Sequence, residues 1–107
     1  MNLSLVIPVF NEQDNLPLLF EALYPTMNSL GKSWEAIFVD DGSRDNSLSI
    51  LKEYAEKDPE HVRVVSFRRN FGQTPAFAAG FDAARGDVVV TMDADLQNDP
   101  ADIAAVL

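Results

Sequence analysis

Four short apolar runs divide the chain, and each is rich in β-branched or aromatic residues. They cover Leu3–Val9, Ala36–Val39, Val62–Phe67 and Val88–Met92. None alternates strictly between apolar and polar positions, a pattern typical of parallel strands that are covered on both faces. The pattern therefore predicts four strands of a buried parallel sheet.

The segments between these runs carry apolar residues three and four positions apart, the spacing of one helix face. The first stripe is Leu16, Leu19, Phe20, Leu23, Met27 and Leu30, with Pro17 near its start and Gly31 just past its end. The second is Leu48, Leu51 and Ala55, and the third is Ala76, Phe77, Gly80, Phe81 and Ala84, stopped by Gly86. We expect three helices, the third of which can approach a sheet closely because its residues are small.

Strands and helices thus alternate, and right-handed crossovers place the helices on both faces of a parallel sheet. The predicted fold class is α/β. Asp99, Pro100 and Asp102 look like the cap and first turn of a fourth helix, which stops at Leu107. Because domain boundaries normally fall in polar linkers, we expect residues 1–107 to be the N-terminal portion of a larger, truncated domain.

Composition narrows the classes of function. A chain of 107 residues with 47% hydrophobic content can bury one modest core. Its net charge of −9 opposes binding to nucleic acid or anionic lipid, and the absence of cysteine removes disulfides, thiolate metal sites and thiol nucleophiles. No apolar run approaches the roughly 20 residues that cross a bilayer, and no signal peptide is recognisable, so a cytoplasmic location is the default expectation.

Polar residues follow all four predicted strands. In an open parallel sheet, ligands bind beyond the carboxyl ends of the strands, so these segments are the candidates for chemistry. They are Pro8–Glu12, Asp40–Asp45, Arg68–Gly72 and Asp93–Gln97. Two of the four are strongly acidic, and a bound cation would relieve the repulsion between their carboxylates.

Asp93 and Asp95 lie two residues apart at a strand end, so both carboxylates can converge on one hard cation such as Mg²⁺ or Mn²⁺. A diphosphate would complete the coordination. The same tripeptide also arises by chance and in turns or helix caps. Its place directly after an apolar strand favours the metal interpretation.

Asp40 and Asp41 allow two interpretations. They can accept backbone N–H groups in a turn and cap the helix that begins near Ser43 or Asp45. Alternatively, a carboxylate can accept hydrogen bonds from a nucleobase or ribose, and Gly42 would let the backbone come near that ligand. The two are compatible, because the pair supplies one acid for each task.

Other polar residues are less specific. Asn11 and Glu12 suit either a site or a helix cap, and Arg68 and Arg69 suit either a site or a solvated pair. We expect His61 at the surface and Trp34 packed near the second strand. No Ser-His-Asp arrangement and no P-loop is present, which makes acyl transfer and ATP hydrolysis poor fits.

Taken in order, four segments closely resemble glycosyltransferase family 2, whose members have the GT-A fold. They are Val6–Glu12, Val39–Asp45, Arg69–Gly72 and Met92–Gln97, and together they cover essentially the whole chain. The Arg-Asn-Phe-Gly segment and Asp93–Pro100 are most similar to the polyprenyl-phosphate branch, which includes dolichol-phosphate mannosyltransferases and bacterial undecaprenyl-phosphate sugar transferases.

The resemblance implies a role for each segment. The nucleoside of a UDP- or GDP-sugar would be bordered by Pro8, Phe10, Asn11 and Glu12, and its base would be held by Asp40 and Asp41. The diphosphate would be held by Asp93, Ala94, Asp95 and Gln97. The metal would bind to Asp93, Asp95 and Gln97. Asp93 and Asp95 would be catalytic, since the cation stabilises charge on the departing diphosphate.

The same resemblance implies an inverting transfer to polyprenyl phosphate by direct displacement. Such an acceptor is already anionic near neutral pH, so the reaction has little need of a general base. The part beyond these residues would bind the acceptor and attach the protein to the cytoplasmic face of a membrane.

Two other classes fit parts of the pattern. A phosphoacceptor receiver domain also gathers acids like Asp40, Asp41 and Asp93 around Mg²⁺, although Asp95 has no place in it. The chain can also be a non-catalytic nucleotide-binding fragment. A sheet edge or apolar face left open by truncation would favour self-association, and no nucleic-acid partner is expected.

Overall fold

The computed structural model describes residues 1–94 of the chain as alternating strands and helices. The strands are β1 (Leu3–Val9), β2 (Trp34–Asp40), β3 (Val62–Ser66) and β4 (Val88–Thr91). The helices are α1 (Leu16–Ser29), α2 (Ser47–Lys57) and α3 (Gln73–Ala83). Every strand and helix predicted within these residues is therefore confirmed, while the segment predicted to begin a fourth helix lies outside the described residues.

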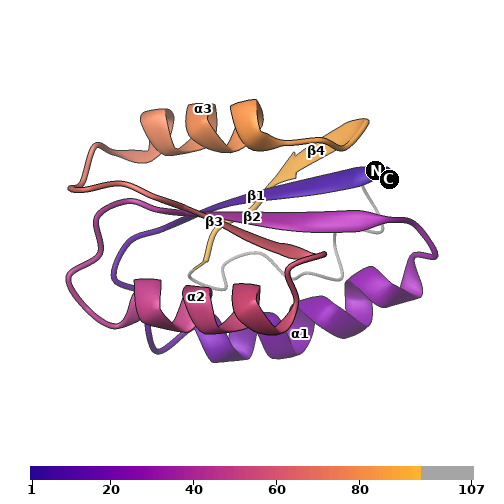
Figure 1. Cartoon of the computed structure of the whole chain (residues 1–107), viewed down its shortest axis with the longest axis horizontal. Helices are drawn as coiled ribbons and strands as arrows, with labels where there is room; N and C mark the ends of the chain where they lie inside the picture. The colour runs from indigo at the N-terminus through magenta and orange to yellow at the C-terminus, as the bar shows by residue number, and fades with distance from the viewer. Residues whose placement is uncertain (95–107) are drawn as a thin grey trace.

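The strands form one parallel sheet in the order β3-β2-β1-β4 (Figure 1). The chain moves from β1 outward to β3 and then crosses to the other side of β1 to form β4. The strand order therefore reverses between β1 and β4, which is where open α/β sheets bind ligands. A receiver domain would place β3 beside β1, so this order contradicts the receiver interpretation.

Helices cover both faces of the sheet, as predicted. Figure 1 shows α1 and α2 on one face and α3 on the other. The larger core lies under α1 and α2 and includes Phe20 and Phe38. The smaller core lies under α3, where a Cβ on Gly80 would come within 2.2 Å of Val6 Cγ1. The predicted close approach of this helix to the sheet is thus confirmed. None of the described helices is long and apolar enough to span a membrane.

Burial differs between the central and the edge strands. Side chains of β1 and β2 are almost all buried, whereas β3 and β4 are largely half-buried or exposed. Val88 and Val89 are 45% and 40% exposed. Within residues 1–94, the expectation that all four strands are covered on both faces is therefore wrong for the edges, because each edge strand pairs there with one neighbour and α3 packs mainly on β1 and β2. Self-association through such an edge stays a prediction.

The surroundings of Trp34 and His61 are partly as expected. Trp34 is buried at the start of β2, which confirms its predicted position. The His61 ring stacks on the Trp34 ring, with 4.1 Å between centroids, and its Nδ1 lies 3.0 Å from Asp58 Oδ2. His61 is therefore half-buried: the indole ring covers one side of the imidazole, while part of the side chain stays exposed at the surface, as expected.

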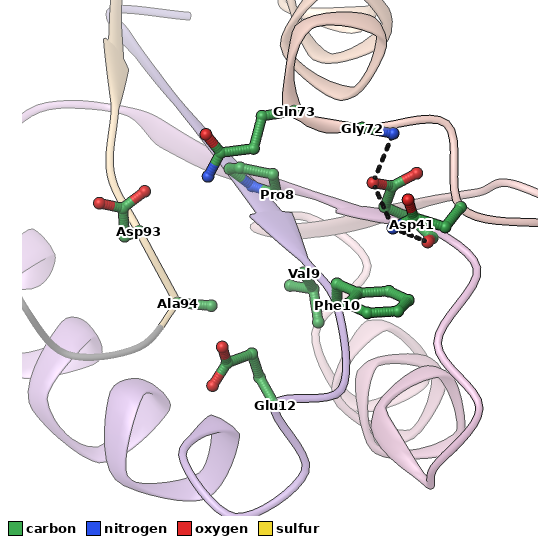
Figure 2. Close-up of a pocket in the computed structure, with 10 residues that line it drawn as sticks. Pro8, Val9, Phe10, Glu12, Asp41, Gly72, Gln73, Asp93 and Ala94 are labelled. Atoms are coloured by element: carbon green, nitrogen blue, oxygen red, sulfur yellow. Dashed lines mark hydrogen bonds between the residues drawn. The ribbon is translucent and has the colours of Figure 1, made fainter.

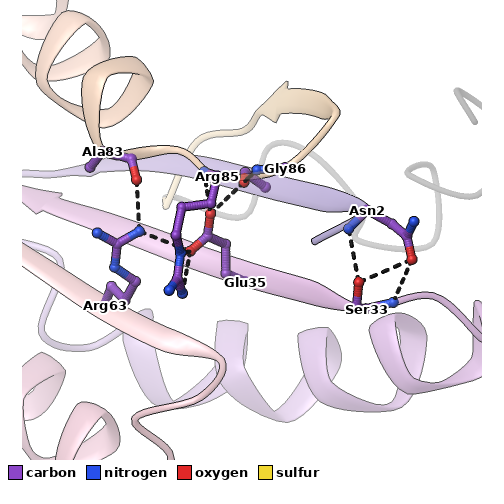
Figure 3. A network of polar contacts seen from close by, with 8 residues as sticks. Asn2, Ser33, Glu35, Arg63, Ala83, Arg85 and Gly86 are labelled. Atoms are coloured by element: carbon purple, nitrogen blue, oxygen red, sulfur yellow. Dashed lines mark hydrogen bonds and ion pairs between the residues drawn. The ribbon is translucent and has the colours of Figure 1, made fainter.

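A charged network closes the amino-terminal end of the sheet (Figure 3). The fully buried carboxylate of Glu35 accepts hydrogen bonds from Ser4, Arg63 and Arg85. Burial raises the pKa of Glu35, but the hydrogen bonds from Ser4, the Arg85 amide and the Arg63 guanidinium outweigh it and lower the pKa to about 2. The network ties β1, β2 and β3 to the segment that precedes β4.

Candidate functional site

A cavity of about 310 Å³ opens at the carboxyl-terminal edge of the sheet (Figure 2). The last residues of β1 and residues that follow each of the four strands line it: Pro8, Val9, Phe10, Glu12, Asp41, Asn70, Gly72, Gln73, Asp93 and Ala94. In Figure 2, Asp93 and Ala94 stand on the β4 side and Asp41 and Gly72 on the opposite side. The polar strand ends that the sequence singled out thus meet around one cavity, at the point where the strand order reverses.

The β1–α1 loop contributes Phe10 and Glu12 to the cavity but not Asn11. Asn11 has a left-handed backbone with φ of 53°, which asparagine tolerates better than most residues. Its N–H donates to Ser43 Oγ at 2.9 Å, and its Oδ1 accepts from the Arg44 N–H at 2.8 Å. Asn11 therefore holds the β2–α2 loop in place and lies outside the lining of the cavity.

Glu12 lines the cavity, and its polar atoms form hydrogen bonds with residues at the starts of α1 and α2. Its carboxylate accepts from Asn15 Nδ2 at 2.8 Å, and its N–H donates to Ser47 Oγ at 2.9 Å. No side chain caps α1, whose N-cap residue is Asn15. The cap interpretation of Asn11 and Glu12 is therefore wrong, because these side chains bind other groups.

Asp45 joins the same two loops from the other side. Its carboxylate accepts from the backbone N–H groups of Gln13 at 3.2 Å and Ser47 at 2.9 Å. Burial raises the pKa of Asp45, but the hydrogen bonds from Ser47 and Gln13 outweigh it and lower the pKa. The β1–α1 and β2–α2 loops are thus held together by bonds between residues about 30 positions apart in the chain.

Asp40 and Asp41 point to different places, as successive residues at a strand end do. The buried carboxylate of Asp40 accepts from the Ser43 N–H at 3.2 Å through Oδ2, while Oδ1 is buried without a hydrogen-bond partner among residues 1–94. Asp40 does not line the cavity, whereas Asp41 does. Asp40 therefore serves the turn and Asp41 the cavity wall. The predicted helix cap is wrong, because α2 begins at Ser47 with Asn46 as its N-cap residue, and a hydrogen bond from Asp41 to a base or ribose stays a prediction.

The β3–α3 loop forms the wall next to Asp41. Asn70 and Gly72 line the cavity, followed by Gln73 at the start of α3. The sequence did not single out Asn70, Gly72 and Gln73 one by one, although the Arg-Asn-Phe-Gly segment that carries the first two was noted for its resemblance. Only the folded structure shows which residues of this loop face the cavity, because Phe71 also donates to Asp41 but does not line the cavity.

Arg68 and Arg69 lie outside this cavity. Both are exposed, and the Arg69 guanidinium stands 4.1 Å from the centre of the Phe71 ring. They border a second hollow of about 560 Å³ together with Ser66, Phe67 and Phe71. Neither arginine forms an ion pair with another described residue. Of the two interpretations, a solvated pair fits this placement better than a role in the cavity.

Asp93 and Ala94 follow β4 and complete the described lining, whereas Asp95 and Gln97 lie outside the described residues. Within residues 1–94, no three acidic or histidine side chains come close enough together to hold a metal ion. Carboxylate oxygens of the kind that Asp93 brings to the cavity suit hard cations, which accept phosphate oxygens and water as further ligands. The Asp93 carboxylate is thus of the chemical kind that suits Mg²⁺ or Mn²⁺.

Comparison with families and curated proteins agrees with the motifs. The model of the family described as "Glycosyl transferase family 2" matches residues 4–107. An undecaprenyl-phosphate 4-deoxy-4-formamido-L-arabinose transferase of Pectobacterium atrosepticum is 50% identical over 102 residues, which are 95% of this chain and 31% of that protein. A dodecaprenyl-phosphate galacturonate synthase of Rhizobium johnstonii is 46% identical over the whole chain, which is 32% of that protein. The chain thus spans about a third of the length of these relatives.

Solved structures share the fold. The mannosyltransferase PcManGT of Pyrobaculum calidifontis, in complex with GDP-Man and Mn²⁺, aligns with a TM-score of 0.77 at 24% identity, over 97% of this chain and 30% of that one. Residues 1–349 of S. aureus TarS in complex with UDP align with a TM-score of 0.72 at 25% identity, over 89% of this chain and 28% of that one. The described α/β sheet is therefore the start of a GT-A fold.

Proposed function

The chain belongs to glycosyltransferase family 2, and we propose that it forms the donor-binding part of an inverting enzyme. The enzyme transfers a sugar from a UDP- or GDP-sugar to polyprenyl phosphate. One observation supports the proposed donor site most strongly. A single cavity extends from Asp41 to Asp93 at the point where the strand order reverses. Residues 1–107 would then be the N-terminal nucleotide-sugar-binding portion of a longer domain.

The cavity suggests how a nucleotide diphosphate lies in it. The base lies near Asp41 and Asn70, the nucleoside passes Pro8, Phe10 and Glu12, and the diphosphate reaches Asp93 and Ala94. The exposed ring of Phe10 offers an apolar surface for the nucleoside. Asn11 and Asp40 support this arrangement through the loops that they join, without lining the cavity themselves.

Asp93, together with Asp95 and Gln97 beyond the described residues, would hold Mg²⁺ or Mn²⁺. A bound cation would neutralise part of the charge of the diphosphate as it leaves. Asp93 is therefore proposed as catalytic, with Asp95 beside it. The complex of PcManGT with GDP-Man and Mn²⁺ supports a divalent cation in a protein of the same fold.

The names of the relatives support a polyprenyl-phosphate acceptor, since they include an undecaprenyl-phosphate and a dodecaprenyl-phosphate sugar transferase. In the proposed reaction, an acceptor phosphate oxygen bonds to the anomeric carbon as the bond from that carbon to the diphosphate breaks. The acceptor oxygen is already anionic, so no proton has to be removed. We place this reaction at the cytoplasmic face of a membrane, where a polyprenyl lipid resides.

Calorimetric titration of the 107-residue chain with UDP and with GDP, each with and without Mn²⁺, tests the donor site. We expect one nucleotide to bind in a metal-dependent manner. Asp93→Ala is expected to weaken that binding roughly tenfold or more, the effect of a lost charged contact. Asp87→Ala is the matched control, because Asp87 is an exposed acid before the opposite end of β4.

Each result separates the candidate functions. Equal affinity of the Asp93→Ala and Asp87→Ala variants would contradict the proposed diphosphate end, and a folded chain that binds neither nucleotide would contradict the donor site. The non-catalytic interpretation is tested by supplying the chain with the sugar form of the nucleotide it binds and with polyprenyl phosphate. Transfer by the chain would exclude that interpretation.

A further inference from the structure

The carboxylate of Asp41 is bound almost entirely by the loop that connects β3 to α3. Asp41 is 4% exposed, and its Oδ1 accepts from the Phe71 N–H at 2.7 Å. Its Oδ2 accepts from the Gly72 N–H and from Asn70 Nδ2, both at 3.0 Å. A carboxylate offers about four acceptor positions, and three are taken by this one loop. Little capacity is left for a ligand.

The next residue packs against the same loop. Gly42 has a left-handed backbone with φ of +74°, and a Cβ there would lie 2.2 Å from the carbonyl carbon of Arg69 and 2.4 Å from the backbone nitrogen of Asn70. Two backbones therefore meet where any side chain would push them apart. The sequence predicted that Gly42 lets the backbone approach a ligand, whereas the structure shows a close approach to the β3–α3 loop. Asp41 and Gly42 thus fix that loop by hydrogen bonds and by contact.

The loop that they fix is a wall of the proposed donor site. Asn70, Gly72 and Gln73 line the cavity, and Figure 2 shows the Gly72 nitrogen directed at Asp41 while Gln73 extends toward Pro8. A shift of this loop would move the cavity wall and the start of α3 together. The hydrogen bonds of Asp41 therefore control the shape of the cavity even if the carboxylate never contacts a nucleotide.

We propose that Asp41 is a positioning residue, which governs nucleotide affinity by holding the β3–α3 loop and not by direct contact with the base. The proposal rests on the donor site proposed above. It differs from the role that the family resemblance implies for the aspartate pair, in which both acids hold the base.

The first test is Asp41→Asn, which keeps the size of the side chain and replaces one acceptor oxygen by an NH₂ donor. At least one of the Phe71 and Gly72 amides then loses its acceptor. We expect hydrogen exchange of these two amides to accelerate about tenfold in the nucleotide-free chain, and UDP or GDP affinity to fall by a similar factor. Asp87→Asn, the same change at an exposed acid, is expected to alter neither quantity.

The second test disturbs the loop while the carboxylate stays in place. Gly42→Ala is expected to displace the loop and to reproduce the loss of affinity. Gly31→Ala is the matched control, because Gly31 has a similar φ of +67° but no atom within 4 Å of the added Cβ. The strain of a positive φ is thus common to both variants, but only the Cβ added in Gly42→Ala contacts the β3–α3 loop.

The outcomes separate this inference from the donor site itself. If Asp41→Asn weakens binding while the Phe71 and Gly72 amides keep their exchange rates and Gly42→Ala binds normally, Asp41 contacts the base and the proposal is overturned. If the unmodified chain binds neither UDP nor GDP, the donor site fails. In that case the effect on affinity fails with the donor site, and the exchange rates decide only whether Asp41 holds the β3–α3 loop: unchanged rates in Asp41→Asn overturn that role, and faster rates support it.

Discussion

Glu35 and Arg85 are joined at three points although they are 50 residues apart in the chain. The Arg85 N–H donates to Glu35 Oε2 at 2.7 Å, and its Nε and Nη2 donate to Oε1 at 3.1 and 3.0 Å. This pair holds the segment before β4 against the centre of the sheet. The pair lies at the amino-terminal end of the sheet, away from the cavity. We therefore expect it to affect the stability of the fold, whereas residues at the carboxyl-terminal edge affect nucleotide binding.

We predict that Glu35→Gln lowers the free energy of unfolding by about 2 to 4 kcal/mol, because it leaves two arginines without their buried carboxylate partner. Urea unfolding followed by circular dichroism measures this change. Glu53→Gln, at an exposed position of α2, is the control and is expected to stay within about 0.5 kcal/mol of the unmodified chain. A Glu35 variant as stable as the control would contradict the structural role of the network.

The same residue predicts a loss of stability in acid. The pKa of Glu35 is about 2 in the folded chain, below its ordinary value of 4.5. Its stabilising contribution, about 3 kcal/mol, is therefore complete above pH 4.5 and disappears as the pH falls toward 2. Urea unfolding at several values of pH between 7 and 2 is expected to show the difference between the unmodified chain and Glu35→Gln shrinking over this range. A difference independent of pH would refute the assignment.

The sequence predicted the central strand well and its neighbour less well. The bounds predicted for β1, Leu3–Val9, agree with the structure because its side chains are apolar almost throughout. β2 begins two residues earlier than predicted, at Trp34. Glu35 interrupts the apolar pattern there, and its partners Ser4 and Arg85 are too distant in the chain for a local pattern to reveal.

The sequence predicted which segments form the candidate site, namely those at the ends of the strands, but not which of their residues face the cavity. The general rule that ligands bind beyond the carboxyl ends of parallel strands placed Glu12, Asp41 and Asp93 near one another. It did not separate Asp40 from Asp41, because which of them faces the cavity depends on the residue at which β2 ends. Nor did it show that Asn11 bonds to the next loop, since that requires the left-handed backbone seen in the structure.

Gly80 is predicted to be intolerant of a methyl group. An added Cβ would lie 2.2 Å from Val6 Cγ1, so Gly80→Ala must push α3 away from β1 and is expected to cost about 1 to 3 kcal/mol of stability. Val6→Ala removes the obstacle, and the double variant should be more stable than the sum of the two single changes predicts. Thermal or urea unfolding of the four proteins measures the coupling. Strict additivity would show that the two positions do not meet.

Asn11 is predicted to matter for stability more than for nucleotide binding, in contrast to Glu12. Asn11→Gly keeps the positive φ and loses the bond to the Arg44 N–H, so we expect a loss of about 1 kcal/mol. Asn11→Ala adds strain of the left-handed backbone and should lose about 2 kcal/mol. Because Asn11 does not line the cavity, calorimetry with UDP or GDP is expected to find Asn11→Gly within about threefold of the unmodified chain. Glu12→Gln changes a lining carboxylate and should shift that affinity further; the reverse order would show that Asn11, and not Glu12, contacts the nucleotide.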